Sequence, residues 1–167
     1  RGLKAISRNA DMDNPETVSV YGVVEDALDL CREKFKAHGI VLTTEWTVGT
    51  PQILARPAQI AQVLVNLLNN AYDALEAPEF KNDEKWVRVC TQVAQDKVRI
   101  EVQDRGTGIS PQIVSRIMDP FFTTKEIGNG PGLGLSISKG IIESHGGGIF
   151  LNNSSLNTQF VIELPTQ

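Results

Sequence analysis

Asparagine and aspartate side chains gather on one face of a segment that is predicted to be helical. Residues 57–75 carry apolar side chains at helical spacing, and Asn66, Asn70 and Asp73 recur beside that stripe at i, i+4 and i+7. Carboxamide oxygens suit a hard cation such as Mg²⁺, which keeps bound waters and takes few protein ligands alongside phosphate oxygens. The alternative is an exposed helix face on which asparagine occurs by chance. Because asparagine is a mediocre helix former, we favour Asn66 and Asn70 as metal ligands.

A second group able to do chemistry is the sequence DRGTGI at 104–109, which follows a β-rich run. Asp104 would stand at the end of a strand, and Gly106 and Gly108 would let the backbone approach a planar ligand closely. A carboxylate at the floor of a pocket accepts a hydrogen bond from an exocyclic amine, which adenine offers and which guanine replaces by a carbonyl at the equivalent edge. The same motif also occurs where a strand simply ends and the chain leaves the sheet. On its own, the motif therefore does not decide between a ligand-binding carboxylate and a plain strand end.

Glycines alternate in GNGPGLGLSI at 128–137, just before an apolar helical segment. Gly130, Gly132 and Gly134 would let unpaired backbone N–H groups at a helix start approach phosphates. The Gly-Lys-Ser/Thr ending of a Walker loop is missing, and no parallel βαβ unit surrounds the motif as in a dinucleotide fingerprint. Lys125, at the end of the preceding DPFFTTK, is a point charge able to reach a phosphate. The long connection that contains it, from roughly Ser110 to Asn129, is expected to form a lid.

The elements that must position these groups are helices mixed with mainly antiparallel strands. Apolar side chains at helical spacing, with glycine after a last turn or proline at a first, predict the helices. Alternating β-rich runs predict the strands, several of them joined as hairpins. This order predicts an α+β fold, a two-layer α/β sandwich with a mixed, mainly antiparallel sheet, helices on one face and a lid loop. The expected helices cover 23–37, 57–75, 111–118 and 132–145, and the expected strands 17–20, 40–46, 53–54, 86–93, 97–104, 149–154 and 158–165.

Composition limits the class of protein. The chain has 167 residues, 41% of them apolar and 22% charged, with a net charge of −4, which is ordinary for a single globular domain. The acidic balance argues against nucleic acid as a partner, because phosphate backbones attract basic surfaces. No apolar run approaches the roughly 20 residues that span a bilayer, and the first residues do not form a secretory leader. The missing initiator Met suggests a fragment, and Cys31 and Cys90, far apart, are expected to be reduced apolar fillers.

Together the four motifs resemble the N box, the two glycine boxes and the F box of bacterial sensor histidine kinases. The matching unit is their catalytic ATP-binding domain, a member of the Bergerat superfamily with gyrase, the MutL proteins and heat-shock chaperones. The likeness covers about residues 15–165, and FFTTK followed by the glycine box and GIIESHGG is similar to the nitrogen-regulatory type. It implies two parts, residues 1–14 as the end of a dimerisation-domain helix with its linker, and residues 15–167 as the catalytic ATP-binding domain.

The resemblance implies ATP and Mg²⁺ as cofactors and gives each matching residue a role. Asn66 and Asn70 would bind Mg²⁺, and Asn66 and Lys125 would be the catalytic residues. Asp104 would accept the adenine amine, with Thr158 supporting the adenine site. The residues expected to bind the nucleotide are Asn66, Asn70, Asp73, Asp104, Gly106, Gly108, Ile109, Lys125, Gly130, Gly132, Leu133, Gly134 and Thr158.

Three positions depart from the family pattern. Pro131 stands in place of a threonine, Arg56 in place of the aspartate that would cap the N-box helix, and Asn157 in place of a glycine. Asn66 itself separates two branches of the superfamily, since its ATPases place a glutamate there to activate water. Because an amide cannot act as a general base, the resemblance implies a phosphoryl donor site that protects ATP from water until a histidine docks.

The expected function is transfer of the γ-phosphoryl group of ATP to a histidine on a separate dimerisation domain, upstream of this chain. A response regulator would act downstream, and the parent protein is expected to be a homodimer. This part is expected to be cytoplasmic, without contact to nucleic acid or membrane, even where the parent is membrane-anchored. The alternatives are a stand-alone Bergerat-fold ATPase, a serine kinase or a degenerate nucleotide-binding module. His38 and His145, both at helix ends, are expected only to interact with the helix dipoles.

Overall fold

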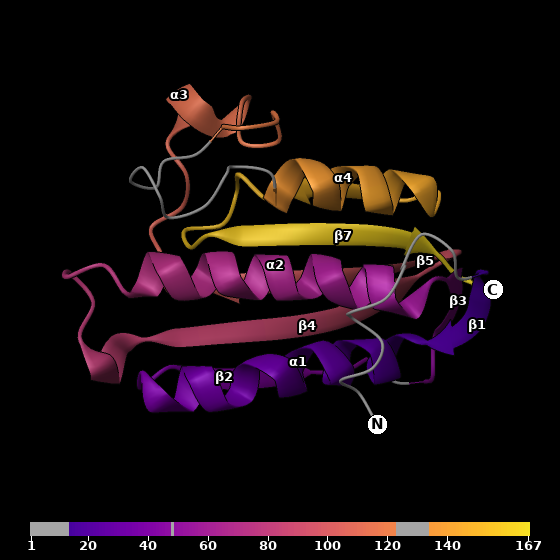
Figure 1. The fold of residues 1–167 in the computed structure, drawn as a ribbon, viewed down its shortest axis with the longest axis horizontal. Helices are drawn as coiled ribbons and strands as arrows, with labels where there is room; N and C mark the ends of the chain where they lie inside the picture. The colour runs from indigo at the N-terminus through magenta and orange to yellow at the C-terminus, as the bar shows by residue number, and fades with distance from the viewer. Residues whose placement is uncertain (1–13, 48, 123–133) are drawn as a thin grey trace.

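The main sheet has five strands in the order β2-β4-β5-β7-β6, and β1 pairs with β3 in a separate antiparallel ribbon. The computed structural model describes residues 14–47, 49–122 and 134–167 (Figure 1). In the main sheet β2 runs parallel to β4, whereas the other neighbouring pairs are antiparallel. The strands are β1 (Glu16–Ser19), β2 (Val41–Glu45), β3 (Gln52–Ala55), β4 (Trp86–Ala94), β5 (Lys97–Asp104), β6 (Gly148–Leu151) and β7 (Gln159–Pro165).

Three helices cover one face of this sheet, with α2 lying between α1 and α4 (Figure 1). The predicted α+β sandwich, with a mixed and mainly antiparallel sheet and helices on one face, is thereby confirmed. Of the expected lid, roughly residues 110–129, residues 123–129 lie outside the described residues, and residues 110–122 contain a short helix at Pro111–Val114 followed by turns. The helices are α1 (Val20–Ala37), α2 (Pro57–Leu75), the short α3 (Pro111–Val114) and α4 (Gly134–Ser144), with a 3-10 turn, η2, at Asn82–Glu84.

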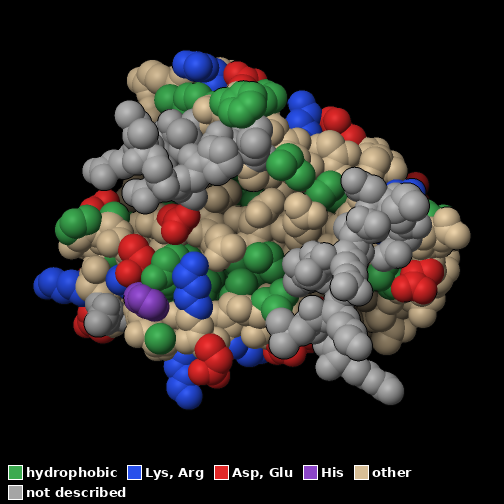
Figure 2. Space-filling view, viewed as in Figure 1, with side chains coloured by type: hydrophobic (Ala, Val, Ile, Leu, Met, Phe, Trp, Pro, Cys, Tyr) green, Lys and Arg blue, Asp and Glu red, His purple; other side chains and the backbone are tan. Residues whose placement is uncertain are grey.

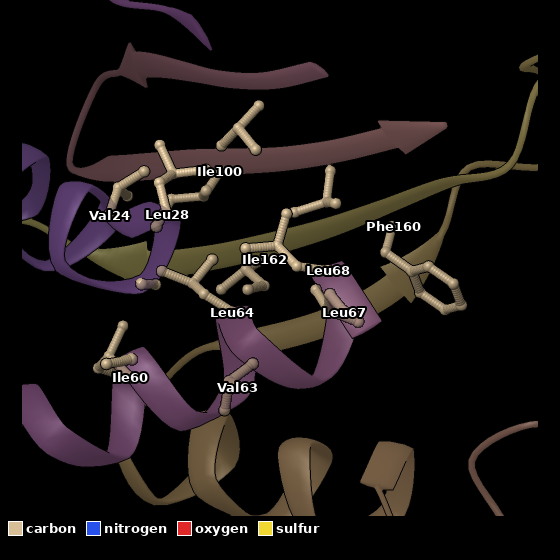
Figure 3. Close-up of a cluster of buried hydrophobic side chains, with 14 of the residues drawn as sticks. Val24, Leu28, Ile60, Val63, Leu64, Leu67, Leu68, Ile100, Phe160 and Ile162 are labelled. Carbon is tan, nitrogen blue, oxygen red and sulfur yellow. The ribbon is translucent and has the colours of Figure 1, made fainter. Parts of the chain in front are cut away.

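The hydrophobic core lies between the helices and the sheet. Ile60, Leu64 and Leu68 project from α2 toward Ile100 of β5 and Ile162 of β7, and each of these side chains is at most 1% exposed (Figure 3). Fully burying a side chain of this kind contributes roughly 1.5–3 kcal/mol. The apolar residues of α2 recur at helical spacing and those of β5 and β7 alternate along the strands. Packing these two groups together therefore determines which face of α2 is directed away from the sheet.

The opposite face of the sheet carries polar side chains, because alternate residues of each strand point away from the helices. Arg99 of β5 and Glu163 of β7 form an ion pair there at 2.7 Å. Cys90 is a free thiol, as predicted, but it lies half-buried on this polar face and donates a hydrogen bond to Glu45, so its predicted role as an apolar filler is wrong. Burial and the neighbouring carboxylate raise the pKa of the Cys90 thiol to about 11. Cys31, in contrast, is a buried and free thiol of α1, as predicted.

Helix ends follow local capping chemistry. The helix α1 begins at Val20, earlier than the predicted Val23, because Ser19 Oγ accepts a hydrogen bond from the Gly22 N–H at 3.4 Å. The prediction of a helix over 111–118 is wrong beyond Val114, where the backbone continues as turns. The helix α2 has the predicted bounds, with Pro57 at its first position.

Acidic and basic side chains are interspersed over the helix-bearing face among the described residues (Figure 2). Charge is therefore not segregated on this side of the molecule. Within the described ranges, each helix is too short or too polar to cross a membrane.

Candidate nucleotide site

Asp104 is the last residue of β5, and its side chain is 4% exposed. The inward alternation of β5, with Val98, Ile100 and Val102 in the core, also turns Asp104 toward the helices. Its Oδ1 accepts a hydrogen bond from the Gly106 N–H at 2.6 Å. The residue thus ends a strand in the middle of the sheet while its carboxylate stays inside the molecule.

Burial raises the pKa of Asp104 to about 6, and hydrogen bonds from the Gly106 N–H and the Thr158 hydroxyl offset part of that rise. A carboxylate kept from water has few ways to satisfy its remaining lone pairs. An amine donor on a ligand would supply such a partner. The desolvated carboxylate is therefore prepared to bind a hydrogen-bond donor.

The turn after Asp104 is held by residues of the β6–β7 connection. The Gly108 N–H donates to Thr158 Oγ1 at 3.2 Å, and the Asn157 amide donates to the Gly106 carbonyl at 3.2 Å. A Cβ at Gly106 would lie 2.5 Å from Asp104 Oδ1 and 2.9 Å from Thr158 Oγ1, so a side chain there would force these two side chains to shift. Asn157, which departs from the family pattern, therefore stabilises this turn through its side-chain hydrogen bond.

A cavity of about 400 Å³ opens beside this turn. Gly108, Ile109 and Thr158 line it, together with residues of α3 and of the β6–β7 connection. Asp104, Asn66 and Asn70 are not among its lining residues, so this cavity covers one side of the predicted site and not the whole of it. Ile109 and Thr158, two predicted site residues far apart in the sequence, both line this cavity.

The middle of α2 presents its asparagines to two different neighbours. Asn66 Nδ2 donates to the Gly134 carbonyl at 3.3 Å and lies 3.3 Å from Ser138 Oγ, both on α4. Asn70 lies one turn further on the same face, whereas Asn69 accepts a hydrogen bond from Lys34 of α1 at 3.2 Å. Asn66 and Asn70, the predicted metal ligands, thus lie on a different face of α2 from Asn69, which contacts α1.

Several predicted site residues fall within or beside the segment 123–133. Lys125, Gly130, Gly132 and Leu133 lie outside the described residues, and so does Pro131. Gly134 is the first described residue of α4 and lies against Asn66. Asp73 is exposed on α2, one turn beyond Asn70. The contribution of the first glycines of the box stays a prediction.

Two residues that the motifs did not single out join α4 to α2. Ser138 is 0% exposed and reaches Asn66. His145 Nδ1 donates to the Ile141 carbonyl at 2.7 Å, and its Nε2 accepts the Arg56 N–H at 3.1 Å, which requires the neutral imidazole. The interaction predicted at the end of α4 is present, but His145 also caps the start of α2, where Arg56 supplies no side-chain cap.

His38 has the role predicted for it. Its Nδ1 lies 2.9 Å from the Lys34 carbonyl in the last turn of α1, and its ring meets that of Tyr72 edge-on. The contact with a terminal carbonyl is the interaction expected for a histidine at a helix C-terminus. His38 lies on the α1 side of α2 and His145 on the α4 side.

The family of the chain follows from residues 55–167, which match the model of the histidine kinase-, DNA gyrase B- and HSP90-like ATPases. The chain belongs to this family. Its fold is that of a histidine kinase catalytic domain: superposition on the catalytic domain of histidine kinase ThkA gives a TM-score of 0.80 at 30% identity, covering 92% of this chain and 96% of that one. ThkA in complex with the response regulator protein TrrA matches with a TM-score of 0.76 at 28% identity, over 92% of this chain and 42% of that one.

The curated relatives include sensor proteins and sensor kinases. The two-component sensor PprA of Pseudomonas aeruginosa is 35% identical over 148 residues, which is 87% of this chain and 16% of PprA. The sensor protein FixL of Bradyrhizobium diazoefficiens is 34% identical, over 88% of this chain and 28% of FixL. The chain therefore spans less than a third of the length of either relative, and the predicted family is confirmed for this part of them.

Proposed function

We propose that this chain is the ATP-binding catalytic domain of a two-component sensor histidine kinase, which donates the γ-phosphoryl group of ATP to a histidine on a separate dimerisation domain. The observation that carries the proposal is the hydrogen bond from the Asn66 amide to Gly134 in the first turn of α4. It puts an amide, and not a carboxylate base, beside the loop expected to wrap the phosphates. That favours phosphoryl transfer to a partner over activation of water, as in the alternative ATPase.

Base recognition is assigned to the Asp104 turn. Asp104 would accept the exocyclic amine of adenine, Gly106 and Gly108 would let the ring approach the backbone, and Ile109 would contact its face. Thr158 would hold the turn in place through its hydrogen bond with Gly108. Support comes from the buried carboxylate with its raised pKa, since a desolvated acceptor discriminates strongly between a donor and a carbonyl.

The donor set on α2 fits Mg²⁺. Asn66 and Asn70 offer carboxamide oxygens one turn apart, and Mg²⁺ needs one or two protein ligands when phosphate oxygens and waters complete its shell. In the part of the chain that is described, no group of three or more His, Cys, Asp or Glu could hold a metal instead. When bound, the ion would neutralise charge on the phosphates. Asp73, exposed one turn beyond, would interact with the outer side of this shell.

The phosphates would be enclosed by groups from the lid and the glycine box. Gly130, Gly132, Leu133 and Gly134 would wrap them with backbone N–H groups at the start of α4, and Lys125 would add a positive charge. These roles follow from the family likeness. Preorganised charge and exclusion of water would then provide the stabilisation of the transferring group.

The remaining parts of the proposal concern the whole protein. Residues 1–14 would be the end of a dimerisation-domain helix and its linker, and residues 15–167 the catalytic domain. The parent would be a homodimer of the nitrogen-regulatory type whose catalytic part acts in the cytoplasm, and a response regulator would receive the phosphoryl group, as the ThkA–TrrA complex suggests.

The experiment that tests the proposal incubates the purified chain with labelled ATP, alone and with a dimerisation domain from its parent protein. Alone, the chain should bind Mg²⁺-ATP yet show negligible self-phosphorylation and very slow hydrolysis, because position 66 offers an amide and not a general base, and because the acceptor histidine is proposed to lie on the separate domain. The added domain should become labelled on histidine. Rapid hydrolysis by the chain alone would support the stand-alone ATPase instead.

Nucleotide selectivity gives a second readout of the same proposal. Asp104→Asn should weaken ATP binding by about tenfold to a hundredfold, the loss expected for one charged hydrogen bond. It should also reduce the preference for ATP over GTP, because the amide can offer a donor to the guanine carbonyl. Unchanged affinities in calorimetry would show that Asp104 only ends the strand.

A further inference from the structure

Ser138 is a polar residue at a buried position of α4, where an apolar side chain could pack equally well. It lies on the inner face of α4, is 0% exposed, and its Oγ is 3.3 Å from Asn66 Nδ2. Serine is less favourable than alanine in the interior of a helix. A buried hydroxyl there implies a role for its hydrogen bond.

The two contacts of Asn66 define the orientation of its carboxamide. The backbone carbonyl of Gly134 can only accept, so the Asn66 atom that faces it at 3.3 Å must be Nδ2 and not Oδ1. The second N–H of Nδ2 is directed to Ser138 Oγ. Because α4 then receives both amide protons, Oδ1 is left facing away from these two acceptors.

We propose that Ser138 is a positioning residue that holds the Asn66 side chain with Oδ1, and not the amide nitrogen, toward the metal and the phosphates. This inference rests on the proposed function of Asn66 as a metal ligand. A carboxamide turned by half a rotation would present N–H groups to a cation, which repel it. Without Ser138, the Gly134 carbonyl is the one remaining contact of the Asn66 amide, among the described residues, that opposes this rotation. Groups that orient a metal ligand typically affect metal affinity by about 10- to 100-fold, and the long 3.3 Å contact favours the lower end.

The test compares Ser138→Ala with Ser144→Ala in this chain. Ser144 also lies on α4 but is exposed, and its hydroxyl contacts the Ile141 carbonyl at 2.7 Å and His145 Nδ1 at 3.3 Å rather than Asn66. Calorimetry gives the affinity for ADP with Mg²⁺ and with EDTA, and the ratio of the two is the gain from the metal. Ser138→Ala should leave the affinity in EDTA within about twofold and lower the gain by about five- to tenfold. Ser144→Ala should change neither.

A double-mutant cycle with Asn66→Ala then identifies the route of the effect. If Ser138 acts through Asn66, Ser138→Ala should not lower the gain further in the Asn66→Ala background. An equal loss of ADP affinity with and without Mg²⁺ would overturn the inference and leave Ser138 a structural residue. If Asn66→Ala lowers the gain and Ser138→Ala does not, the positioning role alone is wrong. If Asn66→Ala itself leaves the gain unchanged, the metal assignment in the proposed function is wrong.

Discussion

Asp104 at the end of β5 and Asn66 in the middle of α2 are held by different means. The Asp104 carboxylate accepts hydrogen bonds from the Gly106 N–H of its own turn at 2.6 Å and from the Thr158 hydroxyl, and it is almost fully buried. The Asn66 amide is only half-buried and is held at 3.3 Å by Gly134 and Ser138 of another helix. The Asp104 carboxylate is therefore held mainly by its own strand end and turn, with Thr158 as one distant partner, whereas the Asn66 amide is held by the packing of α4 on α2.

The turn at Asp104 and the middle of α2 also differ in what their polar groups cost in free energy of folding. Burying a carboxylate costs free energy in the unliganded chain, and a ligand that donates a hydrogen bond recovers some of it. The asparagine carries no charge, so its position costs little, but its orientation depends on contacts between segments far apart in the sequence. Under the proposed roles, base recognition would be preformed at the expense of stability, whereas metal binding would depend on the α2–α4 contact.

The largest effect is expected from removing the buried charge. The folded pKa of Asp104, about 6, lies above the unfolded value, so the folded state holds the extra proton between about pH 4 and 6. Stability from this group is therefore present at low pH and is lost as pH rises through 6. About two pKa units correspond to about 3 kcal/mol. In urea unfolding, Asp104→Asn should gain about that much relative to the unchanged chain between pH 4 and pH 7.

The control for the loss of one negative charge is Asp83→Asn, since Asp83 is exposed in the η2 turn. Its stability difference from the unchanged chain should not follow the same profile. A constant difference for Asp104→Asn across this pH range would mean that the carboxylate is not desolvated in the folded chain. The contrast between the two regions would then disappear.

A side chain at Gly106 should disturb the same turn by crowding. Its Cβ would lie 2.5 Å from Asp104 Oδ1 and 2.9 Å from Thr158 Oγ1. Overpacking of this kind costs about 1–3 kcal/mol, so Gly106→Ala should lower stability and ATP affinity together. Gly140→Ala is the matched control, since a Cβ on that helical glycine of α4 meets no atom within 4 Å. It should keep ATP affinity and raise stability by up to about 1 kcal/mol. Equal behaviour of the two variants would contradict the tight packing around Gly106.

On the metal side, Asn70→Ala should weaken phosphoryl transfer without weakening base binding. Losing one carboxamide ligand should lower the Mg²⁺-dependent gain in ADP affinity by about tenfold, while adenosine, which lacks phosphates, should bind as before. Asn69→Ala is the control, because Asn69 is on the same helix but bonds to Lys34 of α1. If adenosine affinity falls as far as the metal-dependent gain, α2 supports the whole pocket and Asn70 is not a specific ligand.

The elements that the sequence predicted correctly are those defined by local patterns of apolar residues and turn residues. The bounds of α2 agree because its apolar spacing and Pro57 define a helix without help from the rest of the chain. The β4–β5 hairpin was likewise readable, since both strands alternate across a short turn. The start of α1 was missed because the cap by Ser19 is a single hydrogen bond that competes with strand formation.

Contacts between distant segments could not be predicted in this way. Asn157 bonds to the turn after Asp104, and His145 bonds to Arg56, across sequence separations of 51 and 89 residues respectively. Neither pair carries a periodic or spacing signal, and a sequence comparison with the family marks Asn157 only as a departure. The candidate site was recognised from motifs, but the residues that fasten those motifs to one another emerge from tertiary packing.

The smallest effect is expected from His145→Ala, and it tests whether the metal side depends on one hydroxyl or on the whole α2–α4 contact. Losing the acceptor for the Arg56 N–H should cost about 1 kcal/mol in urea unfolding, since the site is partly buried. His38→Ala, at the exposed end of α1, should cost less. Asn66 keeps its own bonds to Gly134 and Ser138, so the Mg²⁺-dependent gain in ADP affinity should stay within about twofold in both variants. A loss in His145→Ala as large as that in Ser138→Ala would mean that the two helices respond as one unit. The orientation of Asn66 would then be a property of the helix packing and not of its nearest hydroxyl.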